Sequence, residues 1–124
     1  MKTLGYYNGE IAELDKLTMP VLDRACYFGD GVYDVTYSRN YRAFAIKEHI
    51  LRLFQSAEIV QIHPAISQKE LCALICSLLK RMHTGENRIY IQFSRGSGNR
   101  NHAFPSKSSP NLLIMIEPAA LRDP

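Results

Sequence analysis

The stretch SRGSGNRNHAFP, residues 94–105, carries three basic side chains and no carboxylate. In an extended chain, Arg100 and His102 project to the same side, with about 7 Å between their Cα atoms. A guanidinium donates two parallel hydrogen bonds to a carboxylate, and an imidazole adds a third. The pair is therefore a candidate carboxylate-binding site, and the alternative is a solvated loop with incidental charges. Arg95 has no assigned role in this hypothesis.

Arg52 and Tyr33 are two further residues to consider. Arg52, in KEHILRLF, falls away from the apolar stripe of an expected helix and one turn beyond Glu48. Taken alone, this spacing indicates a surface ion pair with that glutamate. Tyr33 follows the turn FGDG and begins a β-branched, aromatic run, where a tyrosine is typical of a core or cross-strand position.

Other ligand-binding patterns are weak. The glycines of RGSGNR do not form a nucleotide phosphate loop, because no Lys-Ser/Thr pair and no helix follow them. Cys72, Cys76 and His83 share one side of an expected helix, but eleven residues span about 16 Å along its axis. One metal ion therefore cannot bind all three, and we expect no metal site. Together with Cys26 the cysteines number three, which does not form a disulfide framework.

The elements that must position these residues follow from periodicity. Asn8-Gly9 predicts a tight hairpin, and alternation or apolar runs predict strands at 32–38, 88–94 and 111–117. Helical spacing predicts one helix at about 47–59 and a second from a capping box at Ser67 and Glu70 to about Met82, with Gly85 as its stop signal. The order of strands, two helices and two more strands favours an α+β fold with a largely antiparallel sheet.

Composition limits the classes of partner. The net charge is +3 and the basic residues are dispersed, which argues against a nucleic-acid-binding protein. The longest apolar run, LLIMI, has five residues, far short of the roughly 20 that span a bilayer. Because the N-terminus lacks the apolar core of a signal peptide, we expect no membrane contact and a cytoplasmic protein.

Three segments together resemble the fold-type IV pyridoxal-phosphate enzymes, and within them the D-amino-acid aminotransferase branch. The segments are DRACYFGDGVYDV, KEHILRLFQSAEI and RIYIQFSRGSGNRNHAFP. The resemblance covers nearly the whole chain but only the N-terminal, smaller domain of that family. It implies a small domain at residues 1–118 and the start of an interdomain linker at 119–124. Asp34 departs from the pattern, since a glutamate is more usual there.

The resemblance also implies roles for individual residues. Arg52 is similar to the arginine that binds the phosphate of pyridoxal 5'-phosphate in that family. Tyr33, Arg100 and His102 match the group that binds the α-carboxylate of the substrate, with the Arg-x-His pair supplied by the neighbouring subunit. The substrates implied are amino acids and 2-oxo acids, and the assembly implied is a homodimer with shared active sites. The lysine that forms the family's Schiff base has no match in the sequence, so we expect the 124-residue chain alone to be inactive.

Other functions remain open. A branched-chain aminotransferase and an aminodeoxychorismate lyase share the same fold, although the former usually lacks the Arg-x-His pair. A non-catalytic dimerisation or anion-binding module is a hypothesis from another class.

Overall fold

The computed structural model describes residues 1–98 and 109–120, and Arg100 and His102 lie outside these ranges. The described chain forms one six-stranded sheet in the order β2-β1-β6-β5-β3-β4, and each adjacent pair of strands is antiparallel. The strands are β1 (Leu4–Tyr7), β2 (Glu10–Ala12), β3 (Gly31–Arg39), β4 (Arg42–Ala43), β5 (Asn87–Ser94) and β6 (Asn111–Pro118). The predicted α+β class with an antiparallel sheet is confirmed.

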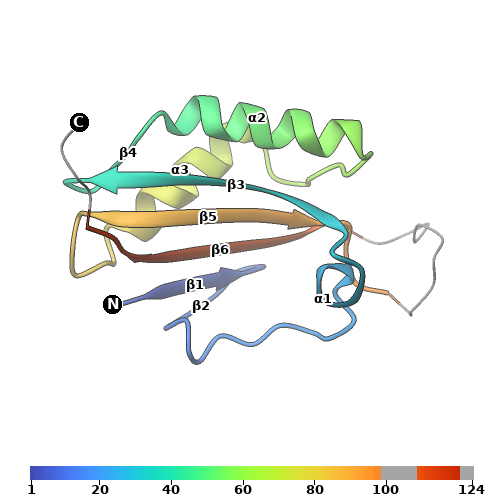
Figure 1. Cartoon of the computed structure of the whole chain (residues 1–124), viewed down its shortest axis with the longest axis horizontal. Helices are drawn as coiled ribbons and strands as arrows, with labels where there is room; N and C mark the ends of the chain where they lie inside the picture. Colours follow the sequence, from blue (N-terminus) through green and yellow to red (C-terminus); the bar gives the residue numbers. More distant parts are fainter. Residues whose placement is uncertain (99–108, 121–124) are drawn as a thin grey trace.

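Helices α2 (Ile46–Ile59) and α3 (Gln68–Leu79) cover one face of the sheet (Figure 1). The predicted apolar stripe of the first helix is buried, because Ile50, Leu53 and Ala57 are fully covered. The core forms between the helices and the alternate strand residues that point toward them. Its sheet side is built from Leu4, Ile89, Ile91, Phe93, Leu112, Ile114 and Ile116. The alternation predicted for residues 88–94 is thus confirmed.

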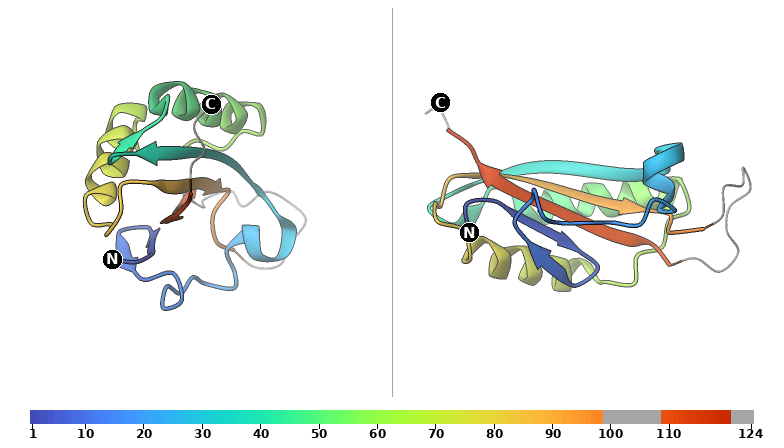
Figure 2. Two further views of the ribbon diagram at one scale, coloured as in Figure 1. Left: turned by 60° about the vertical axis from the view of Figure 1, so that its left-hand side comes forward. Right: turned by 90° about the horizontal axis from the view of Figure 1, so that it is seen from below.

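The opposite face of the sheet is covered unevenly (Figure 2). Near β1, Leu14 and Leu17 approach Gly5 so closely that a Cβ at Gly5 would lie 2.6 Å from Leu17 Cδ2. At the β3 side of this face, Tyr33 and Tyr37 are 65% and 43% exposed. This second face therefore carries an exposed tyrosine-bearing surface at its β3 side.

The Asn8-Gly9 prediction is confirmed. Tyr7 pairs with Glu10, which leaves two turn residues, and both have positive φ, 46° at Asn8 and 100° at Gly9. These are the backbone angles of a type I′ turn, which Asn-Gly adopts at little cost.

Helix α1 (Arg24–Phe28) was not expected, because the two-helix prediction left this segment irregular. The side chain of Asp23 accepts a hydrogen bond from the Ala25 amide, and Gly29 ends the helix with left-handed φ and ψ of 60° and 29°. Five residues are too few to show a helical apolar period, so only these caps mark the helix in the sequence.

The predicted end of the second helix is wrong. Helix α3 ends at Leu79, not at about Met82, and Gly85 does not cap it. Gly85 instead lies against the turn after β3, where an added Cβ would be 2.7 Å from the Tyr41 backbone nitrogen. The glycine is required for close backbone approach rather than for a left-handed helix stop.

No helix in the described ranges is long and apolar enough to cross a bilayer.

Candidate functional site

Strand β3 carries the candidate residue Tyr33 and its neighbour Asp34 on opposite faces. Consecutive strand residues point to opposite faces, so Tyr33 lies on the exposed second face and Asp34, only 5% exposed, lies on the helix face. Strand β4 pairs only with Ser38 and Arg39, so among the described residues no strand pairs with this edge of β3 at its beginning, which we call the free edge.

Arg52 of α2 contacts β3 through Asp34. Its Nε lies 2.7 Å from Asp34 Oδ2 and one terminal nitrogen lies 2.7 Å from Oδ1, a bidentate ion pair. The Arg52 side chain is nevertheless 65% exposed, whereas that of Asp34 is 4% exposed. The partner of Arg52 is thus the strand carboxylate rather than Glu48, the surface partner that helical spacing alone indicates. The pairing holds the guanidinium fixed at the surface next to the free edge.

His49 completes this cluster. Its Nδ1 lies 2.8 Å from Asp34 Oδ1, and the carboxylate can only accept, so Nδ1 is the donor. Burial by itself raises the pKa of Asp34, but the hydrogen bonds from Arg52 and His49 outweigh burial and hold that pKa below its usual range. The same pair raises the pKa of Arg52, chiefly through the Asp34 hydrogen bond. Asp34 therefore stays ionised and Arg52 stays charged.

Tyr33 is ordered by a neighbouring ring. It stacks on Tyr90 of β5 with ring centroids 5.4 Å apart and 19° between the ring planes. Within the described residues, no hydrogen bond involves the Tyr33 hydroxyl. Tyr33 is thus a cross-strand aromatic, as its position predicts, but it is exposed rather than in the core.

The segment that carries Arg100 and His102 begins and ends at this end of the sheet. Ser94, at the end of β5, pairs with Gly31 at the start of β3 and with Asn111 at the start of β6. The connecting segment therefore leaves β5 beside Gly31, two residues from Tyr33, and returns to β6, one strand further from β3. The carboxylate-binding role of Arg100 and His102 stays a prediction.

Arg95, the third basic residue of that stretch, has a structural role. It is 8% exposed, its Nε lies 2.9 Å from Asp30 Oδ2, and a terminal nitrogen donates to the Val60 carbonyl at 2.8 Å. The stretch itself holds no carboxylate, and the acidic partner of Arg95 is Asp30, from a turn 65 residues earlier in the chain. Arg95 also lines a surface pocket of about 460 Å³ between that turn and the end of α2.

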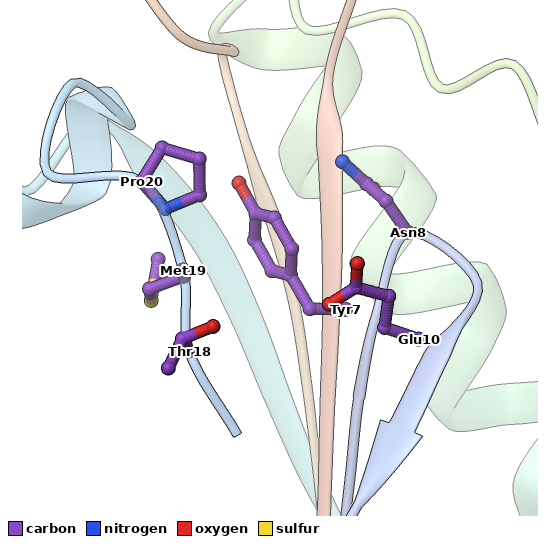
Figure 3. A pocket seen from close by; sticks show the side chains of 6 residues that line it. All are labelled: Tyr7, Asn8, Glu10, Thr18, Met19 and Pro20. Atoms are coloured by element: carbon purple, nitrogen blue, oxygen red, sulfur yellow. The ribbon is translucent and has the colours of Figure 1, made fainter. Parts of the chain in front are cut away.

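A second pocket, of about 440 Å³, lies on the face of the sheet away from the helices (Figure 3). It is lined by Tyr7, Asn8, Glu10, Thr18, Met19 and Pro20. The hydroxyl of Tyr7 donates a hydrogen bond to Asp23 Oδ2 at 2.8 Å. Burial, and to a smaller extent this hydrogen bond, raises the pKa of Tyr7 far above its usual value. Tyr7 therefore anchors the segment before α1 to β1. No motif in the sequence marks this contact.

The described residues hold no group of three or more histidine, cysteine or acidic side chains that fits a metal ion.

Comparisons with known proteins converge on one family. The sequence profile of the class IV aminotransferases matches residues 31–124. D-alanine aminotransferase of Staphylococcus epidermidis is 35% identical over 101 residues, which cover 82% of this chain and 36% of the relative. D-alanine aminotransferase of Bacillus licheniformis is 32% identical over 118 residues, covering 95% and 41%. The chain thus spans about two fifths or less of the length of these curated relatives.

Solved structures share the fold. The branched-chain aminotransferase of Escherichia coli superposes with a TM-score of 0.84 at 20% identity, covering 94% of this chain and 40% of that one. A hypothetical aminotransferase from Mycobacterium tuberculosis, in a PLP-bound form, gives 0.77 at 24% identity, covering 93% and 39%.

Proposed function

Since this chain belongs to the class IV aminotransferase family, we propose that it forms the small domain of a pyridoxal-phosphate-dependent aminotransferase. In this proposal the complete enzyme transfers an amino group between a D-amino acid and a 2-oxo acid. The profile match over residues 31–124 and the D-alanine aminotransferase relatives support it. The domain supplies Arg52 for the cofactor phosphate, and Tyr33, Arg100 and His102 for the substrate carboxylate.

The observation that carries the proposal is the fixed, exposed guanidinium of Arg52. Asp34 uses Nε and one terminal nitrogen, and no bond within the described residues uses the other terminal nitrogen. A phosphate is well bound by such oriented N–H donors, because charge-assisted hydrogen bonds are short and directional. The donor set and its exposure at the free edge of β3 therefore fit a phosphate group.

Pyridoxal phosphate, when bound, supplies the electron sink that lets the α-proton of the amino acid leave. This chain's residues supply orientation. Arg52 fixes the phosphate end, and Tyr33 with Arg100 and His102 fixes the carboxylate, which together determine which hydrogen of the substrate faces the base. The base and the cofactor-linking lysine belong, in this proposal, to the larger part of the enzyme.

The same proposal includes a homodimer. The resemblance places the Arg-x-His pair of one subunit in the active site of its neighbour, so that each site needs both copies. Because the curated relatives are more than twice as long as the matched region, the proposed experiments use the full-length gene product.

Replacing Arg52 tests the phosphate role. We expect Arg52→Ala to weaken pyridoxal phosphate binding by roughly tenfold to a hundredfold, because one charge-assisted contact to a dianion is lost. Titration of the apoenzyme, followed by the fluorescence change on cofactor binding, gives the dissociation constant. The matched control is Glu48→Gln on the same helix, for which we expect no change. Equal affinities of the Arg52 variant and the wild type would refute the assignment.

Replacing Arg100 and His102 distinguishes a D-amino-acid aminotransferase from the other activities proposed for this fold. Branched-chain enzymes usually lack the pair, so only a D-amino-acid enzyme depends on it. With D-alanine as donor, we expect Arg100→Ala and His102→Ala each to raise KM by roughly tenfold or more. Arg42→Ala, an exposed arginine on β4, serves as the control. Unchanged KM values in both variants would remove the carboxylate-binding role.

A further inference from the structure

We propose that Tyr90 is a positioning residue, which holds the Tyr33 ring in place for a substrate carboxylate. The inference rests on the proposed role of Tyr33 and adds to it a residue that touches neither cofactor nor substrate in this account. Tyr90 acts through ring stacking and through a hydrogen bond that fixes its own ring.

The sheet register brings the two rings together. Tyr33 pairs directly with Gln92 of β5, and Val35 pairs with Tyr90, so Tyr33 and Tyr90 are diagonal neighbours on the same face. Diagonal pairs lie close enough for aromatic side chains to meet. The centroid separation of 5.4 Å with 19° between planes is a stacked arrangement.

Tyr90 is itself held in place. Its hydroxyl donates to Gln92 Oε1 at 2.7 Å, and the residue is half-buried, while Tyr33 is 65% exposed. Gln92 is also the strand partner of Tyr33, so the three side chains form one compact group. The fixed ring of Tyr90 is therefore a wall against which the exposed ring of Tyr33 rests.

An exposed tyrosine on a free sheet edge otherwise samples several rotamers. Binding then costs the entropy of selecting one of them. Stacking restricts Tyr33 before a ligand arrives and leaves its hydroxyl without a hydrogen bond to any described residue. Tyr37, four residues further along β3 on the same face, has no ring contact within the described residues and offers a natural comparison.

The test measures how tightly the full-length enzyme binds 2-oxoglutarate, by titration calorimetry, in five proteins besides the wild type: Y33F, Y90L, Y90F, Y37L and the double variant Y33F/Y90L. We expect Y90L to weaken binding about threefold to tenfold, which corresponds to the worth of one aromatic stack. We expect Y37L to bind within about twofold of the wild type, and Y90F, which keeps the ring but loses its hydrogen bond to Gln92, to bind with an affinity between those of Y90L and the wild type. In the Y33F background, adding Y90L should change binding by less than twofold, because Tyr90 acts through Tyr33.

Tyrosine ring resonances give a second readout that does not depend on activity. In wild-type protein labelled on tyrosine, the Tyr33 ring protons should be shifted by the Tyr90 ring, and the shift should vanish in Y90L. If Y90L does not fold, Y90M replaces it in every comparison.

The outcomes separate this inference from the proposed function. If Y33F binds as the wild type does, the carboxylate role of Tyr33 fails. If Y33F weakens binding and Y90L does not, Tyr33 keeps its role and the positioning role of Tyr90 is wrong. Additive effects of Y33F and Y90L would also contradict the positioning role, because they would show that Tyr90 acts independently of Tyr33.

Discussion

Asp34 organises the site at the scale of single residues. It is buried on the helix face of β3, yet it accepts hydrogen bonds from two basic side chains of α2, Arg52 and His49. A buried carboxylate is stabilised only when it is paired in this way. The pairing joins the first long strand to the first long helix and orients the guanidinium that we assign to the cofactor phosphate.

The low pKa of Asp34 predicts how stability depends on acidity. The folded-state pKa lies below the unfolded value of about 3.9. Its contribution is therefore fully present above about pH 4 and is lost as the pH falls through the folded-state pKa. We expect Asp34→Asn to lower the free energy of unfolding by about 1–3 kcal/mol at pH 7 and to flatten the loss of stability in acid.

Urea unfolding from pH 3 to pH 7 measures this effect. Glu117→Gln is the matched control, because Glu117 pairs with Arg88 on the surface, where ion pairs contribute little. A variant at Asp34 that follows the wild-type acid curve would show that the carboxylate is not stabilised by its partners.

Single-residue roles were only partly predictable from the sequence. Arg52 and Tyr33 were singled out through family resemblance, and their own spacing favoured a surface ion pair and a cross-strand ring. The Asp34–Arg52 contact joins residues 18 apart in the chain, and it depends on how α2 packs on β3. The sequence pattern points the other way: Asp34, Thr36 and Ser38 form the polar side of the predicted strand, which alternation would place in solvent. Only the packing of the helices shows that this side is buried.

At the scale of elements, local signals located the strands and long helices well. Period-two alternation predicted β5, and the helical stripe predicted α2 within one residue at its start. The capping box at Ser67 and Glu70 is present in the structure, with each side chain bonded to the other's backbone amide. Errors arose where tertiary contact decides the outcome, as at Gly85, whose close approach to Tyr41 no local pattern reveals.

The capping box gives a prediction for α3. We expect Ser67→Ala to lower the free energy of unfolding by about 1 kcal/mol, because the Glu70 amide loses its acceptor. Ser77→Ala on the same helix is the matched control, since Ser77 is an exposed, interior helix position where alanine is favourable. Urea unfolding of both variants is the measurement. Equal destabilisation by the two substitutions would argue against a specific capping contribution.

At the scale of the whole molecule, the two faces of the sheet carry different groups of the candidate site. Its helix face contains the core and, at the free edge of β3, the Asp34–Arg52 pair, whereas its second face carries the Tyr33–Tyr90 stack. The connection that holds Arg100 and His102 is attached at the same end. In the enzyme that we propose, this domain orients the cofactor phosphate, it fixes the substrate carboxylate together with the second copy of the chain, and other parts of the enzyme perform proton transfer.

The specificity of the full-length enzyme tests the central claim most directly. With 2-oxoglutarate as acceptor, kcat/KM is compared for D-alanine and for L-leucine, a donor typical of branched-chain enzymes. We predict that D-alanine is preferred by at least a hundredfold, a difference of about 2.7 kcal/mol between transition states. Preference for L-leucine would contradict the account and would favour the branched-chain activity found on the same fold.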